Sequence, residues 1–279
     1  MKPIIAKKEV TKYILKTFDI HMSKKLGQNF LIDETVVNNI VNAAEIEEGE
    51  TVLEIGPGIG TLTQALAEAK ANVIAVEIDN KLPAVLAKTL EGYDNVRIVH
   101  DDILKVNIRE LVEDKPFKVV ANLPYYITTP IIMGILEQKL PVTRLVTMIQ
   151  KEVADRMIAK PGKKDYGSLS VAVQYYTEPE IVALVPPKSF IPSPAVDSVV
   201  ISCKVRPQPA VKVNSEKMFF TIAKGGFAQR RKTLSNSLKT TGIPADRIKG
   251  ALESAGIDGN RRGETLSLQE FADIANNLA

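Results

Sequence analysis

The chain has 279 residues, of which 45% are hydrophobic and 25% charged, and its formal net charge is +3. These values are typical of a soluble globular protein with one large domain, or one large and one small domain. The longest apolar stretch, residues 119–136, is interrupted by Asn122 and two prolines, which excludes a membrane span, and charges at residues 7–9 exclude a signal peptide. A single cysteine, Cys203, excludes an internal disulfide and a multi-cysteine metal site. We therefore expect a cytoplasmic protein.

The charges are distributed unevenly along the chain. Residues 1–28 carry seven lysines and two acids, and residues 207–279 carry eleven basic and seven acidic residues. The intervening residues 29–206 are consequently net acidic. An acidic middle with basic flanks fits an enzyme that binds a polyanion, although a solvated surface with chance asymmetry fits as well.

Apolar spacing near 3.6 predicts a helix over residues 35–46, and short apolar runs then alternate with helical segments. The predicted strands are 51–55, 73–77, 96–99, 117–121 and 144–150, and the predicted helices between them are 62–69 and 82–90. This alternation predicts an α/β fold with a parallel sheet, helices on both faces and all strand C-termini at one edge. In such sheets a ligand lies at that edge, where the strand order reverses.

The later part of the chain changes in character at a proline-rich run. A helix is predicted over 168–176, followed by strands over 180–185 and 197–205. Residues 206–209 then break regular structure, and only helical patterns follow, over 216–227, 232–239, 245–255 and 267–277. We therefore predict a domain over 1–206 with a basic N-terminal arm, and a small all-helical domain over 207–279.

Three glycines form a turn between the first strand and the next helix. Gly56, Gly58 and Gly60 have G-x-G-x-G spacing with Pro57 inside the loop, and their missing side chains let a ligand approach the backbone. Glu77 ends the next strand, where an acid commonly binds ribose hydroxyls. The spacing differs from the dinucleotide pattern and suits a ligand without a pyrophosphate, such as S-adenosylmethionine. A glycine-rich turn without a ligand is the alternative.

Two acids follow the third predicted strand. Asp102 could accept a hydrogen bond from the adenine amine of the cofactor. The neighbouring Asp101 could do the same, and the sequence alone does not decide between the two. A solvated acidic turn is an equal alternative.

The segment Asn122-Leu123-Pro124-Tyr125 ends the fourth predicted strand and suits an adenine N6 amine. The Asn122 side-chain oxygen and the Leu123 carbonyl could accept its two hydrogens, and Pro124 fixes the local backbone. Tyr125 could stack on the flipped base, which is worth about 1–3 kcal/mol. A plain strand-to-turn exit is the alternative.

Phe190 could sandwich the base from its other face, although a core position is more common for phenylalanine. The two histidines, His21 and His100, have no partners at metal-ligand spacing, so no metal site is expected.

These motifs resemble the small-subunit ribosomal RNA adenine N6,N6-dimethyltransferases, the dimethyladenosine transferase or kasugamycin-sensitivity type. The resemblance runs from about residue 20 to the C-terminus and rests on ordered segments, which are Lys25–Leu31, Glu54–Gly60, Asn122–Tyr125, Phe190–Ser198, Gly226–Lys232 and Arg262–Leu268. It implies a Rossmann-like, class I S-adenosylmethionine-dependent methyltransferase. It also implies methyl transfer to two adjacent adenosines in the 3′-terminal hairpin loop of 16S rRNA, and a role in small-subunit assembly.

The resemblance also assigns residues. Cofactor contacts carry over to Asn29, Leu31, Gly56, Glu77, Asp102 and Asn122. The family usually has glycine before the acid of the third strand, where this chain has Asp101, and this departure weakens the Asp102 assignment. We expect a monomer that binds 16S rRNA within the small subunit or its precursor, without a membrane or a metal.

Binding to RNA requires positive charge, and the acidic middle of the chain does not supply it. The candidates are Lys24 and Lys25, and Arg230, Arg231 and Lys232 at the start of a predicted helix. Alternatively, the last three pair with acids such as Glu264 and hold the two domains together.

Four rival functions share part of this pattern. A macrolide-resistance type methylase acting on large-subunit rRNA is the nearest, and a DNA adenine methylase is weaker. A non-catalytic ribosome-assembly factor would keep the fold, but intact Asn122 and Tyr125 argue against lost activity. An NAD dehydrogenase would need a catalytic histidine or Lys–Tyr pair that we cannot place.

Overall fold

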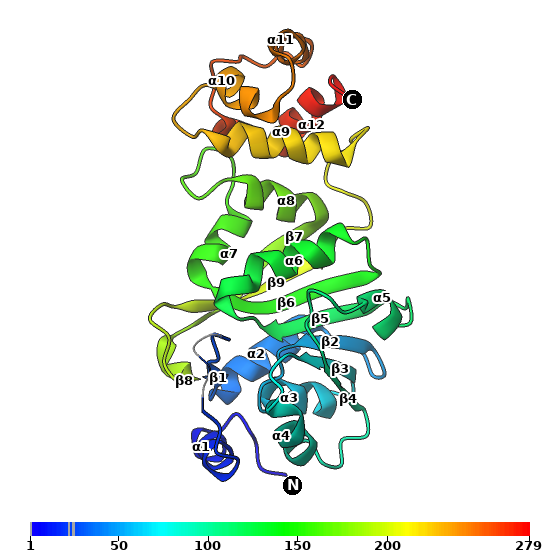
Figure 1. Cartoon of the computed structure of the whole chain (residues 1–279), viewed down its shortest axis with the longest axis vertical. Coiled ribbons are helices and arrows are strands. Elements are labelled where there is room, and N and C mark those ends of the chain that lie inside the picture. The colour runs from blue at the N-terminus through cyan, green and yellow to red at the C-terminus, as the bar shows by residue number, and fades with distance from the viewer. Residues whose placement is uncertain (1, 22, 24–25) are drawn as a thin grey trace. The chain divides into compact units, whose positions relative to one another are not determined.

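The computed structural model describes residues 2–21, 23 and 26–279 (Figure 1). The chain forms two compact units, each built from two stretches of sequence. Unit 1 comprises the described residues up to Ala154 together with Glu180–Val205. Unit 2 comprises Asp155–Pro179 and Arg206–Ala279.

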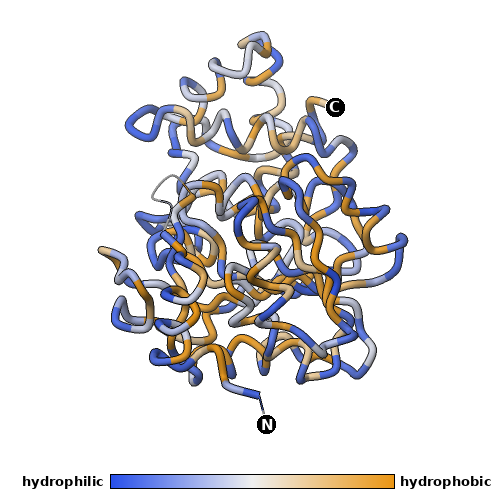
Figure 2. The backbone as a smooth tube through the Cα atoms, turned by 60° about the horizontal axis from the view of Figure 1, so that its bottom comes forward, coloured by the Kyte–Doolittle hydropathy of each residue, from blue (hydrophilic) through white to orange (hydrophobic). Residues whose placement is uncertain are grey.

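A seven-stranded sheet has the order β4-β3-β2-β5-β6-β9-β7. Its strands are β2 (Thr51–Ile55), β3 (Asn72–Glu77), β4 (Val96–His100), β5 (Phe117–Asn122), β6 (Val142–Gln150), β7 (Thr177–Val185) and β9 (Ser198–Val205). The strands from β4 to β6 run parallel, and β9 is antiparallel to β6. The central strands β2 and β5 are buried along almost their whole length, as expected for a sheet covered on both faces. The backbone coloured by hydropathy shows several hydrophobic segments that run close to one another (Figure 2).

The strand order reverses between β2 and β5. From β2 the chain adds β3 and β4 on one side, and β5 and β6 extend the sheet on the other. The glycine turn after β2 and the segment after Asn122 therefore leave the sheet side by side. This is the position at which open α/β sheets bind their ligands.

Short helices connect the parallel strands, and these are α3 (Thr61–Glu68), α4 (Leu82–Thr89), α5 (Ile108–Leu111) and α6 (Thr128–Glu137). Helix α2 (Glu34–Ala44) precedes β2, and helix α7 (Lys151–Ile158) follows β6. Asp33 caps α2, because its side chain accepts hydrogen bonds from the amides of Thr35 and Val36. The apolar sides of α2 and α3 join the sheet in one buried cluster that includes Ile40 and Leu66.

The N-terminal segment, predicted as a basic arm, contains a helix. Helix α1 (Lys8–Thr17) buries Thr11 and Ile14. Ile5 and Ile14 pack in a cluster with residues of α4, and the Ile5 amide donates to Gln64 Oε1 at 2.9 Å. The sequence pattern did not predict this helix, because lysines occupy much of its surface.

A small antiparallel pair closes unit 1 near its ligand edge. Strand β1 (Phe30–Leu31) pairs with β8 (Phe190–Ile191) across about 160 residues of sequence. Leu31 stands opposite Phe190 in this pair.

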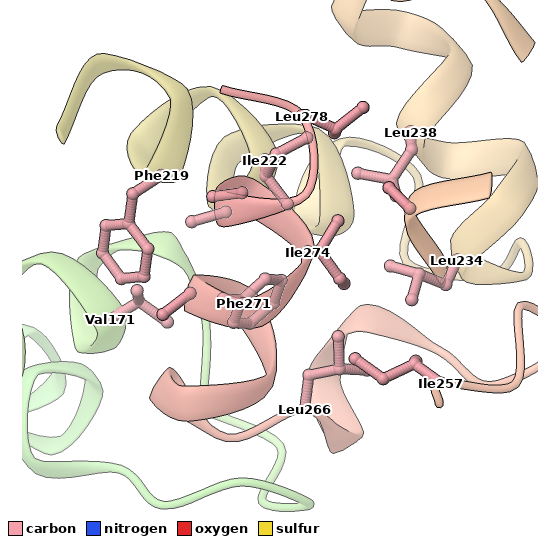
Figure 3. Close-up of a cluster of buried hydrophobic side chains, with 14 of the residues drawn as sticks. Val171, Phe219, Ile222, Leu234, Leu238, Ile257, Leu266, Phe271, Ile274 and Leu278 are labelled. Atoms are coloured by element: carbon pink, nitrogen blue, oxygen red, sulfur yellow. The ribbon is translucent and has the colours of Figure 1, made fainter. Parts of the chain in front are cut away.

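Unit 2 is built from helices around a hydrophobic core (Figure 3). Its helices are α8 (Ser168–Tyr176), α9 (Glu216–Ala228), α10 (Leu234–Leu238), α11 (Ala245–Ser254) and α12 (Leu268–Asn276). Phe219, Phe271 and Leu266 are fully buried at its centre. Two glycines allow close backbone approach, since a Cβ on Gly263 would lie 2.2 Å from the Gly226 carbonyl oxygen.

The division into units differs from the predicted domain boundaries. The break at Arg206 agrees with the prediction to within one residue, but residues 155–179 pack with the C-terminal helices. Tyr166, Val171 and Tyr175 lie in the unit 2 core, and the Tyr166 hydroxyl donates to the Leu266 carbonyl at 2.9 Å. The apolar residues of α8 show that the helix is buried, but not which core it joins. No helix among the described residues is long and apolar enough to cross a membrane.

Candidate active site

A pocket of about 1040 Å³, including its opening to solvent, lies in unit 1 at the point where the strand order reverses. Most of the predicted site residues line it. They are Asn29, Leu31, Gly56, Gly58, Glu77, Asp101, Asp102, Asn122, Leu123, Pro124 and Tyr125.

The glycine turn at one side of the pocket has a left-handed backbone. Gly56, Gly58 and Gly60 have φ values of 69°, 61° and 93°, which residues other than glycine rarely adopt. A Cβ on Gly58 would lie 3.2 Å from the Phe30 ring, whereas a Cβ on Gly56 would meet nothing within 4 Å. Gly56 therefore leaves open space for a ligand, and Gly60 serves the turn itself, since it caps α3 and does not line the pocket.

Glu77 is buried beside this turn. Its Oε2 accepts from the Gly58 amide at 3.1 Å and its Oε1 accepts from the Asp79 amide at 2.9 Å. Burial raises the pKa of Glu77, and these two backbone donors oppose that shift. The carboxyl group is thus fixed at the pocket wall, and each oxygen keeps a second lone pair for a ligand hydroxyl.

A second buried acid, Glu54, also lines the pocket. Burial raises the pKa of Glu54 to about 8, against the opposing effect of the nearby Thr63. Its Oε2 has no hydrogen-bond partner among the described residues. Glu54 begins the glycine motif, and the sequence alone predicts no role for it.

Both acids after β4 line the pocket, and they differ in exposure. Asp102 is partly buried, and its Oδ1 accepts from the Leu104 amide at 3.0 Å. Asp101 is exposed, and its Oδ1 accepts from the Asp102 amide at 2.7 Å. Asp102 is therefore the better placed of the two for an enclosed ligand.

The side-chain amide of Asn122 has a defined orientation. Its Nδ2 donates to the Asn29 carbonyl oxygen at 3.1 Å. A carbonyl only accepts, so the nitrogen must face Asn29 and the amide oxygen must face the other way. No described residue donates to this oxygen, which leaves an oriented acceptor in the wall of the pocket.

The residues after Asn122 are fixed by bonds to distant segments. The Leu123 amide donates to the Met148 carbonyl of β6 at 3.1 Å, and Pro124 has a φ of −60°. The Tyr125 hydroxyl lies 2.6 Å from Ser198 Oγ, and burial raises the pKa of Tyr125. The ring of Tyr125 is therefore anchored at its hydroxyl end while it lines the pocket.

Comparisons with known proteins agree with this arrangement. The sequence model of the family described as ribosomal RNA adenine dimethylase matches residues 20–279. The chain belongs to this family.

Two curated relatives named ribosomal RNA small subunit methyltransferase A are similar over nearly their whole length. The protein from Alkaliphilus oremlandii is 50% identical over 99% of this chain and 98% of its own. The protein from Clostridioides difficile is 52% identical over 95% of this chain and 94% of its own.

Solved structures show the same fold. A dimethyladenosine transferase from Plasmodium falciparum has a TM-score of 0.76 and 26% identity, covering 88% of this chain and 95% of its own. The 23S rRNA methyltransferase ErmE has a TM-score of 0.69 and 28% identity, covering 90% and 99%. The predicted resemblance and the class I methyltransferase fold are thereby confirmed. This adenine dimethylase is an enzyme, and S-adenosylmethionine is its methyl donor.

One predicted base contact does not line the pocket of this dimethylase, and this residue is Phe190. It is 3% exposed and packs in the core of unit 1 with Leu31 and Val36. In the β1–β8 pair it stands opposite Leu31. A contact between Phe190 and the base therefore stays a prediction.

The predicted RNA contacts fall into two groups. Lys24 and Lys25 lie outside the described residues. Arg230, Arg231 and Lys232 are exposed in unit 2, in the turn that follows α9. Arg230 pairs with Glu264 at 3.5 Å and donates to the Lys164 carbonyl, and both partners lie in unit 2, so these contacts do not join the two units. Arg231 and Lys232 form no ion pair with a described residue.

Several pocket residues carried no signal that the sequence interpretation used. Ile78 and Ile103 each follow a strand-end acid, and Tyr126 follows the base motif. Ile78 is 48% exposed and lines the pocket. Their position directly after the strand-end acids is the sequence signal that could have predicted Ile78 and Ile103 as pocket residues.

Proposed function

We propose that this protein transfers methyl groups from S-adenosylmethionine to N6 of two adjacent adenosines in the 3′-terminal hairpin loop of 16S rRNA, giving N6,N6-dimethyladenosines. The proposal includes a role in small-subunit maturation. Its support is the similarity to relatives named small subunit methyltransferase A, together with the pocket of this chain. The observation that carries it is the oriented acceptor of Asn122 beside the glycine turn.

The base motif supplies what an adenine amine requires. The N6 lone pair is delocalised into the ring, so the amine is a weak nucleophile. The Asn122 amide oxygen and the Leu123 carbonyl accept its two hydrogens and favour a pyramidal nitrogen whose lone pair is free to attack. Tyr125, held by Ser198, provides a flat surface against the flipped base. Most of the rate enhancement then comes from positioning.

The opposite wall of the pocket suits the methyl donor. S-adenosylmethionine supplies a sulfonium methyl that is already activated, so this chain needs no strong general base before attack. Glu77 holds the ribose hydroxyls, Asp102 accepts from the adenine amine, and the turn at Gly56 admits the ligand to the backbone. Asn29 and Leu31 close the same pocket from the β1 segment.

The rival rRNA target is less well supported. The structure of ErmE, a 23S rRNA methyltransferase, is 28% identical to this chain, whereas the small-subunit relatives are about 50% identical. A non-catalytic assembly factor would not need an oriented Asn122. We also propose that the protein acts as a monomer in the cytoplasm, where ribosomal subunits mature.

Mass spectrometry of rRNA from a deletion strain tests this function. We expect dimethyladenosine near the 3′ end of 16S rRNA to disappear and to return with a plasmid that encodes the wild-type chain. A plasmid that encodes Asn122→Ala is the matched control and should not restore it. Unmodified 23S rRNA in the deletion strain, with intact 16S rRNA, would instead identify the large-subunit target.

A further inference from the structure

The outer face of α1 carries a row of lysines. Lys8, Lys12 and Lys16 are exposed and four residues apart, so they form one line along the helix with about 6 Å between neighbours. None of them forms an ion pair with a described residue. The helix has one acid, Glu9, and Tyr13 is 69% exposed on the same outer side.

The lysine row contributes little to the stability of the helix itself. Like charges four residues apart cost about 0.2–0.5 kcal/mol per pair in an isolated helix, and Lys8 adds a positive charge in the first turn, where the helix dipole disfavours it. Glu9 in the first turn and Lys16 in the last turn oppose these costs, because both interact favourably with the dipole. The row is therefore free to serve a partner.

Tertiary contacts hold α1 in place instead. Ile5 and Ile14 are buried in a cluster with Phe30 and Leu82, and the Ile5 amide donates to the Gln64 side chain at 2.9 Å. The inner face is therefore anchored, and the lysine row has a fixed direction. A preformed surface binds a partner without the cost of ordering it first.

The anchoring residues also place α1 beside the active site. Phe30 and Leu82, which belong to the same buried cluster as Ile14 of α1, both line the pocket. A target adenosine reaches that pocket as part of an RNA strand, so the adjoining nucleotides must lie on the surface around it. A row of exposed lysines with an exposed aromatic ring is complementary to such a strand, because lysines bind phosphates and aromatic rings stack on bases.

We propose that the outer face of α1, formed by Lys8, Lys12, Lys16 and Tyr13, binds the phosphate backbone of the RNA that presents the target adenosine. Tyr13 stacks on an unpaired base of that RNA. The proposal rests on the proposed function and adds an RNA-binding surface within unit 1 to the one expected from Arg231 and Lys232.

Binding of the full-length chain to purified small ribosomal subunits from the deletion strain tests the surface. The affinity of the variant K8Q/K12Q/K16Q should fall, and its salt dependence should flatten by about 0.7–0.9 for each phosphate that is no longer neutralised, or by about 2–3 if each lysine neutralises one phosphate. Tyr13→Ala should weaken binding with an unchanged salt slope, because stacking releases no counterions. The melting temperature and the affinity for S-adenosylmethionine should stay at wild-type values.

The control variant K70Q/K115Q/K204Q removes the same number of charges from unit 1. Lys70 and Lys115 precede β3 and β5. Lys204 of β9 stands opposite Arg144, near the start of β6, in the antiparallel ladder. All three therefore lie at the ends of the strands opposite the pocket. This variant should keep the wild-type slope. Equal slopes for wild type and K8Q/K12Q/K16Q, or an equally flattened slope in the control, would overturn the α1 proposal. Failure of the wild-type chain to methylate these subunits would overturn the proposed function instead.

Discussion

The two sides of the pocket are built by different means. On the cofactor side, Glu77 is fixed by the backbone amides of Asp79, two residues away, and Gly58, 19 residues away. On the base side, the side chain of Asn122 is fixed by a carbonyl 93 residues away. The acid of the cofactor side is thus held within one strand–helix–strand unit, whereas the amide of the base side is oriented by a distant segment. Substitutions on the cofactor side should change mainly affinity, and those on the base side should change mainly rate.

The largest effect expected is that of Asn122→Ala on turnover. Loss of one oriented group at a reacting centre costs about 10²–10³ in rate, which corresponds to about 2.7–4 kcal/mol. The affinity for S-adenosylmethionine should change much less. Single-turnover methylation of small subunits and calorimetry with the cofactor measure the two quantities. Near-wild-type turnover of Asn122→Ala would refute the prediction that the base side controls mainly the rate.

Glu77→Ala should show the converse pattern. The substitution removes a carboxyl group that we assign to the ribose and leaves the Gly58 amide without its acceptor. Cofactor affinity should fall by about 10- to 100-fold, since hydrogen bonds to charged groups contribute about 1.5–3 kcal/mol. The rate at saturating cofactor should fall less. Unchanged affinity in calorimetry would remove Glu77 from the site.

Glu54 should make the ligand-free protein less stable at higher pH. Because burial raises its pKa to about 8, the unfolded chain releases this proton from about pH 4.5 upward while the folded chain retains it. Folding stability should therefore fall between about pH 5 and pH 8, by an amount on the order of a few kcal/mol.

Glu54→Gln tests this dependence, because it removes the titrating proton and keeps the shape of the side chain. The variant should gain a few degrees in melting temperature over wild type as pH rises from about 5 to 8. Parallel melting curves across this range would show that Glu54 is not the titrating group.

The smallest effects are expected for the basic residues of unit 2, and they concern RNA binding and stability. Arg231→Ala/Lys232→Ala should flatten the salt slope of subunit binding by about 0.7–0.9 for each phosphate that these residues neutralise, with no change in melting temperature. Arg230→Ala should lower the melting temperature instead, because it breaks the pair with Glu264. Neither variant should change cofactor affinity. A slope that flattens only in Arg230→Ala would show that Arg230 contacts RNA and that Arg231 and Lys232 do not.

Some elements followed directly from the sequence. The strand β2 and the helix α8 have the predicted bounds, because a continuous apolar run and a 3.6-residue period are local signals. Helix α6 was missed because Pro130 and Gly134 lie within it. Pro130 stands in its first turn, where the absent amide hydrogen costs nothing.

By itself, the sequence determined the family, the alternating strands and helices, and the glycine turn with its acid, since each depends on residues close together in the chain. Only the tertiary structure decided which core residues 155–179 join, that Phe190 is buried and that α1 is anchored. It also decided how Asn122 is oriented. These features depend on partners far away in sequence. An apolar pattern predicts that a face is buried, but it does not specify the residues against which that face packs.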